Sequence, residues 1–156
     1  MTPELVVNRI VANKSTYMEL MLIGDESEDM VRRYIDICSL YVCFVESAAV
    51  GCIATTRIDA ETIEVKNLAV VPDYRRRGLG RHLLDFVEKL HPDHKIYIGT
   101  GETPSTLRFY QSCSYRYSHR IPNFFTDNYP DPIVEENVTL KDMIYLYKDL
   151  LQDDRR

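Results

Sequence analysis

Hydrophobic and polar residues follow two periods along this chain, and the change of period separates predicted helices from predicted strands. A short apolar run predicts a first strand over 5–10, and segments with helical spacing predict helices over 14–23 and 27–38. Segments 40–45 and 50–58 are rich in β-branched and aromatic residues, so they predict a hairpin of two neighbouring strands. The first half of the chain therefore combines helices with antiparallel strands.

The second half continues with a strand, a helix and another strand. A strand over 62–71 ends at Pro72-Asp73, and a helix with one apolar stripe follows over 78–90. Further predicted elements are a strand over 96–99, a helix over 104–113 that Thr103 caps and Pro104 begins, and strands over 115–121 and 143–147. Between the last two lies an aromatic and proline-rich loop, 122–137. Loops of that length in compact domains are usually functional or disordered.

Composition narrows the class of protein. The chain has 156 residues, which suits one domain over 1–156, and its net charge of −5 argues against a nucleic-acid-binding protein. The sequence has neither an apolar run long enough to span a membrane nor the basic and apolar start of a signal peptide, so a cytoplasmic protein is expected. The cysteines form no metal-binding pattern and predict buried apolar positions, with no metal site. They are Cys38, Cys43, Cys52 and Cys113.

The strongest chemical signal is Arg75-Arg76-Arg77-Gly78-Leu79-Gly80, which joins the strand ending at Val71 to the next helix. Amides at a helix N-terminus bind anions, and glycines let a phosphate approach the backbone. Arginines add positive charge and planar donors that suit phosphate oxygens. The spacing fits neither a P-loop nor the GxGxxG dinucleotide fingerprint. The turn therefore predicts a pyrophosphate site of another kind.

This turn resembles the central motif of the GCN5-related N-acetyltransferase (GNAT) superfamily, [Arg/Gln]-x-x-Gly-x-[Gly/Ala], matched by Arg75, Gly78 and Gly80. The resemblance implies an α/β fold with a mixed, mostly antiparallel sheet, flanked by helices and splayed at the cofactor site. It also implies acetyl-CoA as co-substrate. By resemblance, the cofactor would contact the strand end and the turn, with Thr103 near the start of a later helix. These residues are Leu68, Ala69, Val70, Arg75, Arg76, Arg77, Gly78, Leu79, Gly80, Arg81 and Thr103.

A second segment, Phe109 to Tyr115, resembles the family's FYxxxGF motif, with Ser114 in place of glycine and Tyr115 in place of phenylalanine. The resemblance implies that Tyr110 is the general acid that protonates the departing thiolate, and a phenol is a suitable donor for that step. The reaction also needs a base to deprotonate the amine. Glu64 is the candidate base, although its position on a strand fits a solvated surface residue equally well. His119 is an alternative base.

The loop 122–137 resembles a segment of a bacterial GNAT subgroup that ends in NYPxPIxENG, with Asn137-Val138 in place of Asn-Gly. We expect it to border the acceptor pocket through Phe125, Asp127, Tyr129 and Glu135, which suit a cationic amine. The predicted acceptor is a small-molecule primary amine. Protein lysines or N-termini, a non-catalytic CoA-binding module, and a homodimer interface formed by the loop aromatics stay open as alternatives.

Overall fold

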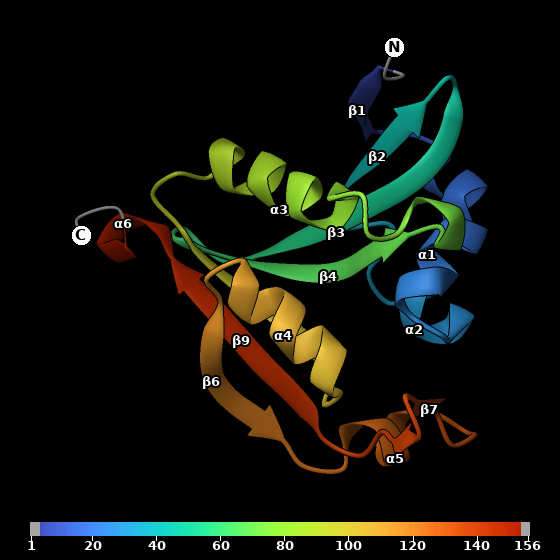
Figure 1. Ribbon diagram of the computed structural model, residues 1–156, viewed down its shortest axis with the longest axis vertical. Coiled ribbons are helices and arrows are strands. Elements are labelled where there is room, and N and C mark those ends of the chain that lie inside the picture. The colour runs from blue at the N-terminus through green and yellow to red at the C-terminus, as the bar shows by residue number, and fades with distance from the viewer. Residues whose placement is uncertain (1–3, 154–156) are drawn as a thin grey trace. The chain divides into compact units, whose positions relative to one another are not determined.

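The computed structural model describes residues 4–153, which form two compact units divided after Pro92. Residues 1–3, part of the polar N-terminus considered above, lie outside the described range. Each unit combines antiparallel strands with helices (Figure 1). This is the α/β architecture, with helices flanking antiparallel strands, that the sequence predicts.

The first unit is a sheet of four strands in the order β1-β2-β3-β4. Every neighbouring pair in it is antiparallel, as the predicted hairpin requires. The strands are β1 (Leu5–Ile10), β2 (Ser39–Val45), β3 (Ala48–Asp59) and β4 (Thr62–Val70). The helices are η1 (Lys14–Tyr17), α1 (Met18–Gly24), α2 (Glu28–Arg32), η2 (Pro72–Tyr74) and α3 (Leu79–Leu90).

Helices cover the first sheet because its strands are apolar on both faces. Leu40, Val42 and Cys52 share a core with residues of α1 and α2. Tyr41 of the same sheet meets Phe86 of α3 edge to face, with ring centroids 5.3 Å apart. Since neighbouring strand residues point to opposite faces, α3 lies on the side of the sheet opposite to α1. The predicted helix over 27–38 is shorter than expected, because regular helix ends at Arg32 and turns follow to Cys38.

The second unit contains a sheet in the order β5-β9-β6, again antiparallel. Its strands are β5 (Lys95–Gly101), β6 (Arg116–Ile121) and β9 (Met143–Asp149). Its other elements are α4 (Pro104–Ser112), α5 (Phe124–Asn128), the short hairpin β7 (Val134–Glu135) and β8 (Val138–Thr139), and α6 (Leu150–Asp153). The loop expected over 122–137 is therefore partly regular, because it holds α5 and the first strand of the hairpin.

The four cysteines are free and buried. This confirms the sequence prediction that they serve as small apolar side chains. Burial raises the pKa of the Cys43 thiol to about 11 and that of the Cys52 thiol to about 12. Neutral thiols with such pKa values are poor nucleophiles near pH 7. Covalent chemistry at these two positions is correspondingly disfavoured.

Candidate functional site

The turn between β4 and α3 brings the arginine and glycine motif to the start of a helix. After η2, Arg75 is extended, Arg76 has a φ of 62° and Gly78 has a φ of 80° as the N-cap of α3. A Cβ built on Gly78 would meet no atom within 4 Å among the described residues. Glycine is therefore favoured here by the left-handed backbone conformation, and crowding plays no part.

The N-terminus of α3 keeps its positive end available to an anion. Gly78 has no side chain to cap the first amides, and the first turn of the helix carries no acidic residue. The three arginines that precede Gly78, which are Arg75, Arg76 and Arg77, are all exposed. Uncapped amides, the helix dipole and nearby guanidinium groups together favour a phosphate ligand.

Two of these arginines also shape the turn. The Arg75 Nε–H donates to the Val70 carbonyl oxygen over 3.2 Å, so the motif is bonded to the end of β4. The guanidinium of Arg77 lies over the Tyr74 ring, 4.8 Å from its centroid. Such cation–π contacts orient the guanidinium without neutralising its charge. The side chains of the motif thus help to hold the conformation that exposes the α3 amides.

The strand end predicted to contact the cofactor is paired with β3 through Ile53–Leu68, Cys52–Ala69 and Gly51–Val70. A Cβ on Gly51 would lie 3.0 Å from the Ala69 carbonyl oxygen, so this glycine permits close packing of the two strands. Pairing fixes Leu68, Ala69 and Val70 in the sheet. Their contact with a cofactor stays a prediction.

Glu64 lies on β4 before an irregularity in its pairing. Ala54 faces Asn67 while Thr55 faces Val65, so Lys66 is an extra residue in β4. The Lys66 ammonium is 3.4 Å from the Glu64 carboxylate and 5.9 Å from the centroid of the Tyr34 ring. The Glu64 side chain is only 14% exposed. Glu64 is thus more enclosed than a solvated strand residue would be.

His119, the alternative base, is exposed on β6. Its ring stacks on Tyr145 with centroids 4.8 Å apart, and its Nδ1 lies 2.8 Å from the Ser118 hydroxyl. These contacts hold the His119 ring against the second sheet. Its role as a base stays a prediction, and Glu64 remains the preferred candidate.

A buried polar chain beside β4 was not predicted from the sequence. Asn67 is 3% exposed, and its Nδ2 donates to the Met21 carbonyl oxygen over 2.8 Å and to the Tyr34 hydroxyl over 3.0 Å. The Tyr34 hydroxyl donates to Asp25 over 3.2 Å. Burial is the main reason that the pKa of Tyr34 lies well above its usual range. An asparagine among apolar strand residues was the available signal, because buried amides need partners.

Tyr110 lies near the end of α4 and is 7% exposed. Burial, with a smaller contribution from Cys113, raises the pKa of its phenol well above the usual range. The group therefore stays protonated at neutral pH, as a proton donor must. Its ring meets Phe109 and Tyr115 edge to face, at centroid distances of 5.1 and 6.2 Å.

Thr103 occupies the N-cap position of α4, and Pro104 follows it at the first helical position, as predicted. The expected side-chain cap is not formed. The Thr103 hydroxyl is buried and does not bond to the first amides of the helix; it interacts with the Glu136 carboxylate instead and lowers the pKa of that group. The prediction was right about the position of the helix start and wrong about the hydrogen bond.

The segment 122–142 has a small core of its own. Phe125, Ile133 and Leu140 are buried together, and Phe124, Tyr129 and Met143 pack around them. Of the residues predicted to contact the acceptor, Phe125 is thus a packing residue, Tyr129 and Glu135 are half-buried, and Asp127 is exposed. Contact of these four residues with an acceptor stays a prediction, and the structure gives Phe125 and Tyr129 a packing role in addition.

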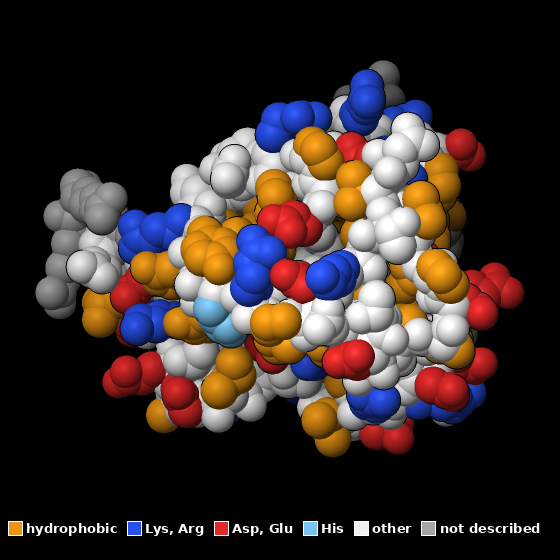
Figure 2. Space-filling view, turned by 90° about the horizontal axis from the view of Figure 1, so that it is seen from below, with side chains coloured by type: hydrophobic (Ala, Val, Ile, Leu, Met, Phe, Trp, Pro, Cys, Tyr) orange, Lys and Arg blue, Asp and Glu red, His pale blue; other side chains and the backbone are white. Residues whose placement is uncertain are grey.

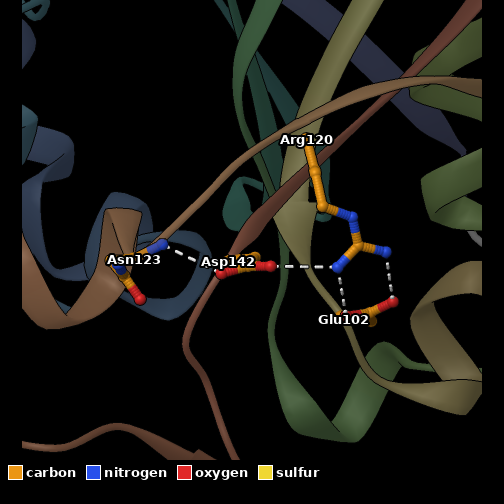
Figure 3. Close-up of polar contacts among 4 residues, drawn as sticks. All are labelled: Glu102, Arg120, Asn123 and Asp142. Carbon is orange, nitrogen blue, oxygen red and sulfur yellow. Dashed lines mark hydrogen bonds and ion pairs between the residues drawn. The ribbon is translucent and has the colours of Figure 1, made fainter.

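Arg120 joins three parts of the second unit and was not singled out by the sequence (Figure 3). Its guanidinium contacts Glu102 in two hydrogen bonds of 3.3 and 3.1 Å, and Asp142 in one of 3.0 Å. The backbone N–H of Asn123 also donates to Asp142 over 2.9 Å. These bonds lower the pKa of Asp142, the backbone donor contributing most.

Within residues 4–153, no group of three or more His, Cys, Asp or Glu side chains is placed to hold a metal ion. In the same range, no helix is long and apolar enough to cross a membrane. Figure 2 shows acidic, basic and hydrophobic side chains intermixed on the face it presents.

The sequence matches known proteins over most of its length. Residues 36–117 match the family model described as an acetyltransferase (GNAT) domain. An uncharacterised N-acetyltransferase, YvbK of Bacillus subtilis, is 32% identical over 137 residues, which are 85% of this chain and 88% of that protein. The chain belongs to the GNAT acetyltransferase family. The chain is therefore a GNAT N-acetyltransferase, the enzyme class that the motif at Arg75–Gly80 and the segment around Tyr110 indicated.

Solved acetyltransferase structures agree with this assignment. A GNAT acetyltransferase from Elizabethkingia anophelis, solved with acetyl-CoA bound, is 32% identical, with a TM-score of 0.87 over 94% of this chain and 98% of that one. A Bacillus subtilis acetyltransferase in complex with CoA is 28% identical, with a TM-score of 0.83 over 95% and 100%. An IAA acetyltransferase from Bacillus cereus is 27% identical, with a TM-score of 0.86 over 94% and 100%. This GNAT chain therefore shares its fold with enzymes crystallised with the cofactor.

Proposed function

We propose that this GNAT enzyme transfers an acetyl group from acetyl-CoA to a primary amine of a small molecule, as a single acetyltransferase domain over 1–156. The supporting observation is the N-terminus of α3, where Gly78 leaves the first amides without a side-chain cap and three exposed arginines directly precede it in the chain. That arrangement suits the pyrophosphate of CoA. Two relatives described as bound to acetyl-CoA or CoA add support.

The proposed reaction is direct transfer in a ternary complex. Residues Arg75 to Arg81 hold the pyrophosphate, and backbone groups of Leu68, Ala69 and Val70 hold the pantetheine arm and polarise the thioester carbonyl. Thr103, the N-cap residue of α4, is proposed as a further cofactor contact. Each group supplies donors where the cofactor carries oxygen acceptors.

Proton transfer is assigned to two residues. Glu64 removes a proton from the acceptor ammonium, so that the amine nitrogen can form its bond to the acetyl carbon. Tyr110 gives its phenolic proton to the sulfur as the carbon–sulfur bond breaks, and the resulting phenolate takes up the second proton that the nitrogen of the new amide releases. A buried phenol with a raised pKa is suited to this second step because it is protonated throughout the neutral range.

The acceptor is proposed to be cationic before it reacts. Asp127 is exposed and Glu135 is half-buried on the segment 122–142, and carboxylates attract an ammonium group. The aromatic rings of Tyr129 and Phe125 belong to the same segment and suit the apolar part of a small amine. Protein lysines and N-termini carry the same ammonium group and are the second class of acceptor to test.

The test is a turnover screen. Thiol release from acetyl-CoA would be measured with polyamines, aminoglycosides, amino acids and peptides, and the acetylated product identified by mass spectrometry. Turnover with small amines above peptides is the expected result. Turnover with peptides alone would replace the proposed acceptor, and CoA binding without any thiol release would indicate a non-catalytic CoA-binding module.

The cofactor site has its own test, which does not depend on finding the acceptor. Arg76→Gln and Arg77→Gln should each weaken CoA binding about three- to tenfold, since each removes a charged donor. Arg57→Gln is the matched control, an exposed arginine on β3. Calorimetry would measure the three affinities. Equal affinities would place the pyrophosphate elsewhere.

The cytoplasmic location and the homodimer stay predictions, and light scattering of the purified protein tests the dimer.

A further inference from the structure

The Arg120 guanidinium joins two carboxylates that lie far apart in the sequence of the second unit. One belongs to Glu102, the residue between β5 and the N-cap of α4, which Arg120 contacts with both of its terminal nitrogens. The other belongs to Asp142, the residue that precedes β9. Figure 3 shows the Arg120 side chain reaching both carboxylates. Because a guanidinium is planar and its donors are fixed, this pairing sets direction as well as distance.

Asp142 in turn closes the segment 122–142. It accepts the N–H of Asn123, and the neighbouring Phe125 N–H donates to the Lys141 carbonyl oxygen, both over 2.9 Å. A third bond of 2.8 Å, from the Leu140 N–H to the Ile133 carbonyl oxygen, joins the inner part of the segment. The two ends of the segment are therefore tied together at the point where Arg120 is bound.

The tip of the hairpin in this segment faces the same helix start. Glu136 and Asn137 have φ values of 51° and 63°, which reverse the chain between β7 and β8. Thr103 and Ser105, in the first turn of α4, lower the pKa of the Glu136 carboxyl because their donors face it. The segment thus meets the start of α4 at two points. At its base, Arg120 joins Asp142 to Glu102, and at its tip Glu136 faces Thr103 and Ser105.

We propose that Arg120 is a positioning residue that fixes the segment 122–142 against the start of α4 and thereby sets acceptor specificity. This inference deepens the proposed function, because it depends on that segment bordering the acceptor. Arg120 touches no substrate in this proposal. It acts through Glu102 and Asp142, and its effect reaches the acceptor through the carboxylates and rings that the segment carries.

Loss of this connection should leave the enzyme folded. Arg120 and Glu102 are 41% and 46% exposed, and exposed ion pairs contribute little to global stability. Their effect is local, because they restrict a segment that has only three buried residues in its core. A kinetic effect can therefore be separated from unfolding.

The experiment compares Arg120→Gln, Arg120→Lys and the control Lys95→Gln, which removes one exposed positive charge from β5. Hydrogen exchange would follow the amides of Asn123, Phe125 and Leu140. Arg120→Gln should raise their exchange rates roughly tenfold with no change in the core of β9. Arg120→Lys should restore part of the protection, since lysine keeps the charge but loses the two-pronged geometry.

Kinetics with the best amine from the screen supply the second measurement. In Arg120→Gln, kcat/KM for the acceptor should fall about tenfold, while the KM for acetyl-CoA changes less than about twofold. The ratios of kcat/KM between different amines should become smaller, so the variant is less selective than the wild type. Unchanged exchange rates, or equal losses for acetyl-CoA and acceptor, would overturn the proposal. If the wild type acetylates no amine, the proposed function is wrong, whatever Arg120 does. Hydrogen exchange is measured without substrate, so it tests the positioning role of Arg120 separately.

Discussion

The backbone N–H of Tyr115 donates to the Tyr110 carbonyl oxygen over 3.0 Å, and the two aromatic rings meet edge to face at 6.2 Å. With the Ser114 N–H bonded to the Gln111 carbonyl oxygen over 3.0 Å, these contacts form a Schellman motif at the end of α4. The Lys148 ammonium, which donates to the Cys113 carbonyl oxygen over 3.2 Å, satisfies another carbonyl at this helix end. The proposed acid is therefore held by the end of its own helix.

Ser114 occupies the left-handed position of that motif, with a φ of 72°. Ser114→Gly should raise the free energy of unfolding by about 1 kcal/mol, because glycine adopts this conformation without strain. Urea denaturation followed by circular dichroism would measure it. Ser112→Gly, two residues earlier in the helix, is the control and should destabilise the protein. A Ser114→Gly protein less stable than wild type would contradict the prediction.

Tyr110→Phe should lower kcat about 100-fold and change the KM for acetyl-CoA little, because it removes only the proton donor. Burial raises the pKa of Tyr110. The wild-type rate should consequently show no loss from phenol ionisation as pH rises to about 10, the ordinary tyrosine pKa. Steady-state rates from pH 6 to 10 provide the measurement. Full kcat in the variant at every pH would remove Tyr110 from the mechanism.

Gly78→Ala separates backbone strain from cofactor binding at the turn. A residue with a side chain at a φ of 80° costs about 1–2 kcal/mol, although the added methyl group meets no atom within 4 Å among the described residues. The variant should also bind CoA more weakly, since the methyl group would stand where a phosphate approaches the amides. Thermal unfolding and CoA titration give the two values. A stability loss without any change in CoA affinity would mean that the phosphate lies elsewhere.

Asn67→Ala should destabilise the first unit by about 2–4 kcal/mol, because it leaves the Met21 carbonyl and the Tyr34 hydroxyl without their donor and opens a small cavity. Tyr34→Phe should cost less, since it removes a hydroxyl and keeps the ring. Chemical denaturation of both single variants and the double variant would measure their coupling. Additive losses would show that the two side chains do not form one network.

Alkaline pH should destabilise the protein through its buried thiols. The pKa values are raised from 9.0 to about 11 for Cys43 and about 12 for Cys52. Above pH 9 the unfolded chain loses these protons while the folded protein retains them, so stability falls as pH rises from 9 towards 12. Cys52→Ala should show a smaller loss between pH 8 and 11 than wild type. An identical pH dependence would assign the loss to other groups.

The sequence predicted the elements whose signals are local. The helix start at Gly78 follows from the motif, and Pro104 marks the start of α4 as expected. The α2 region was predicted too long because apolar spacing continues into turns after Arg32. Thr103 is the N-cap residue as predicted, but its side-chain hydrogen bond to the helix is not formed, because residue type favours a cap while the direction of the hydroxyl depends on its surroundings.

The sequence by itself determined the family, the strand-to-helix turn of Arg75–Gly80 and the position of Tyr110, because motif spacing and backbone preference act between near neighbours. Only the tertiary structure decided the partners of Asn67 and Arg120, which lie 46 residues away at Met21 and 18 and 22 residues away at Glu102 and Asp142. It also turned the predicted loop into a segment with a core. Hydrogen bonds and packing between distant residues depend on how strands pair, and no local pattern records that pairing.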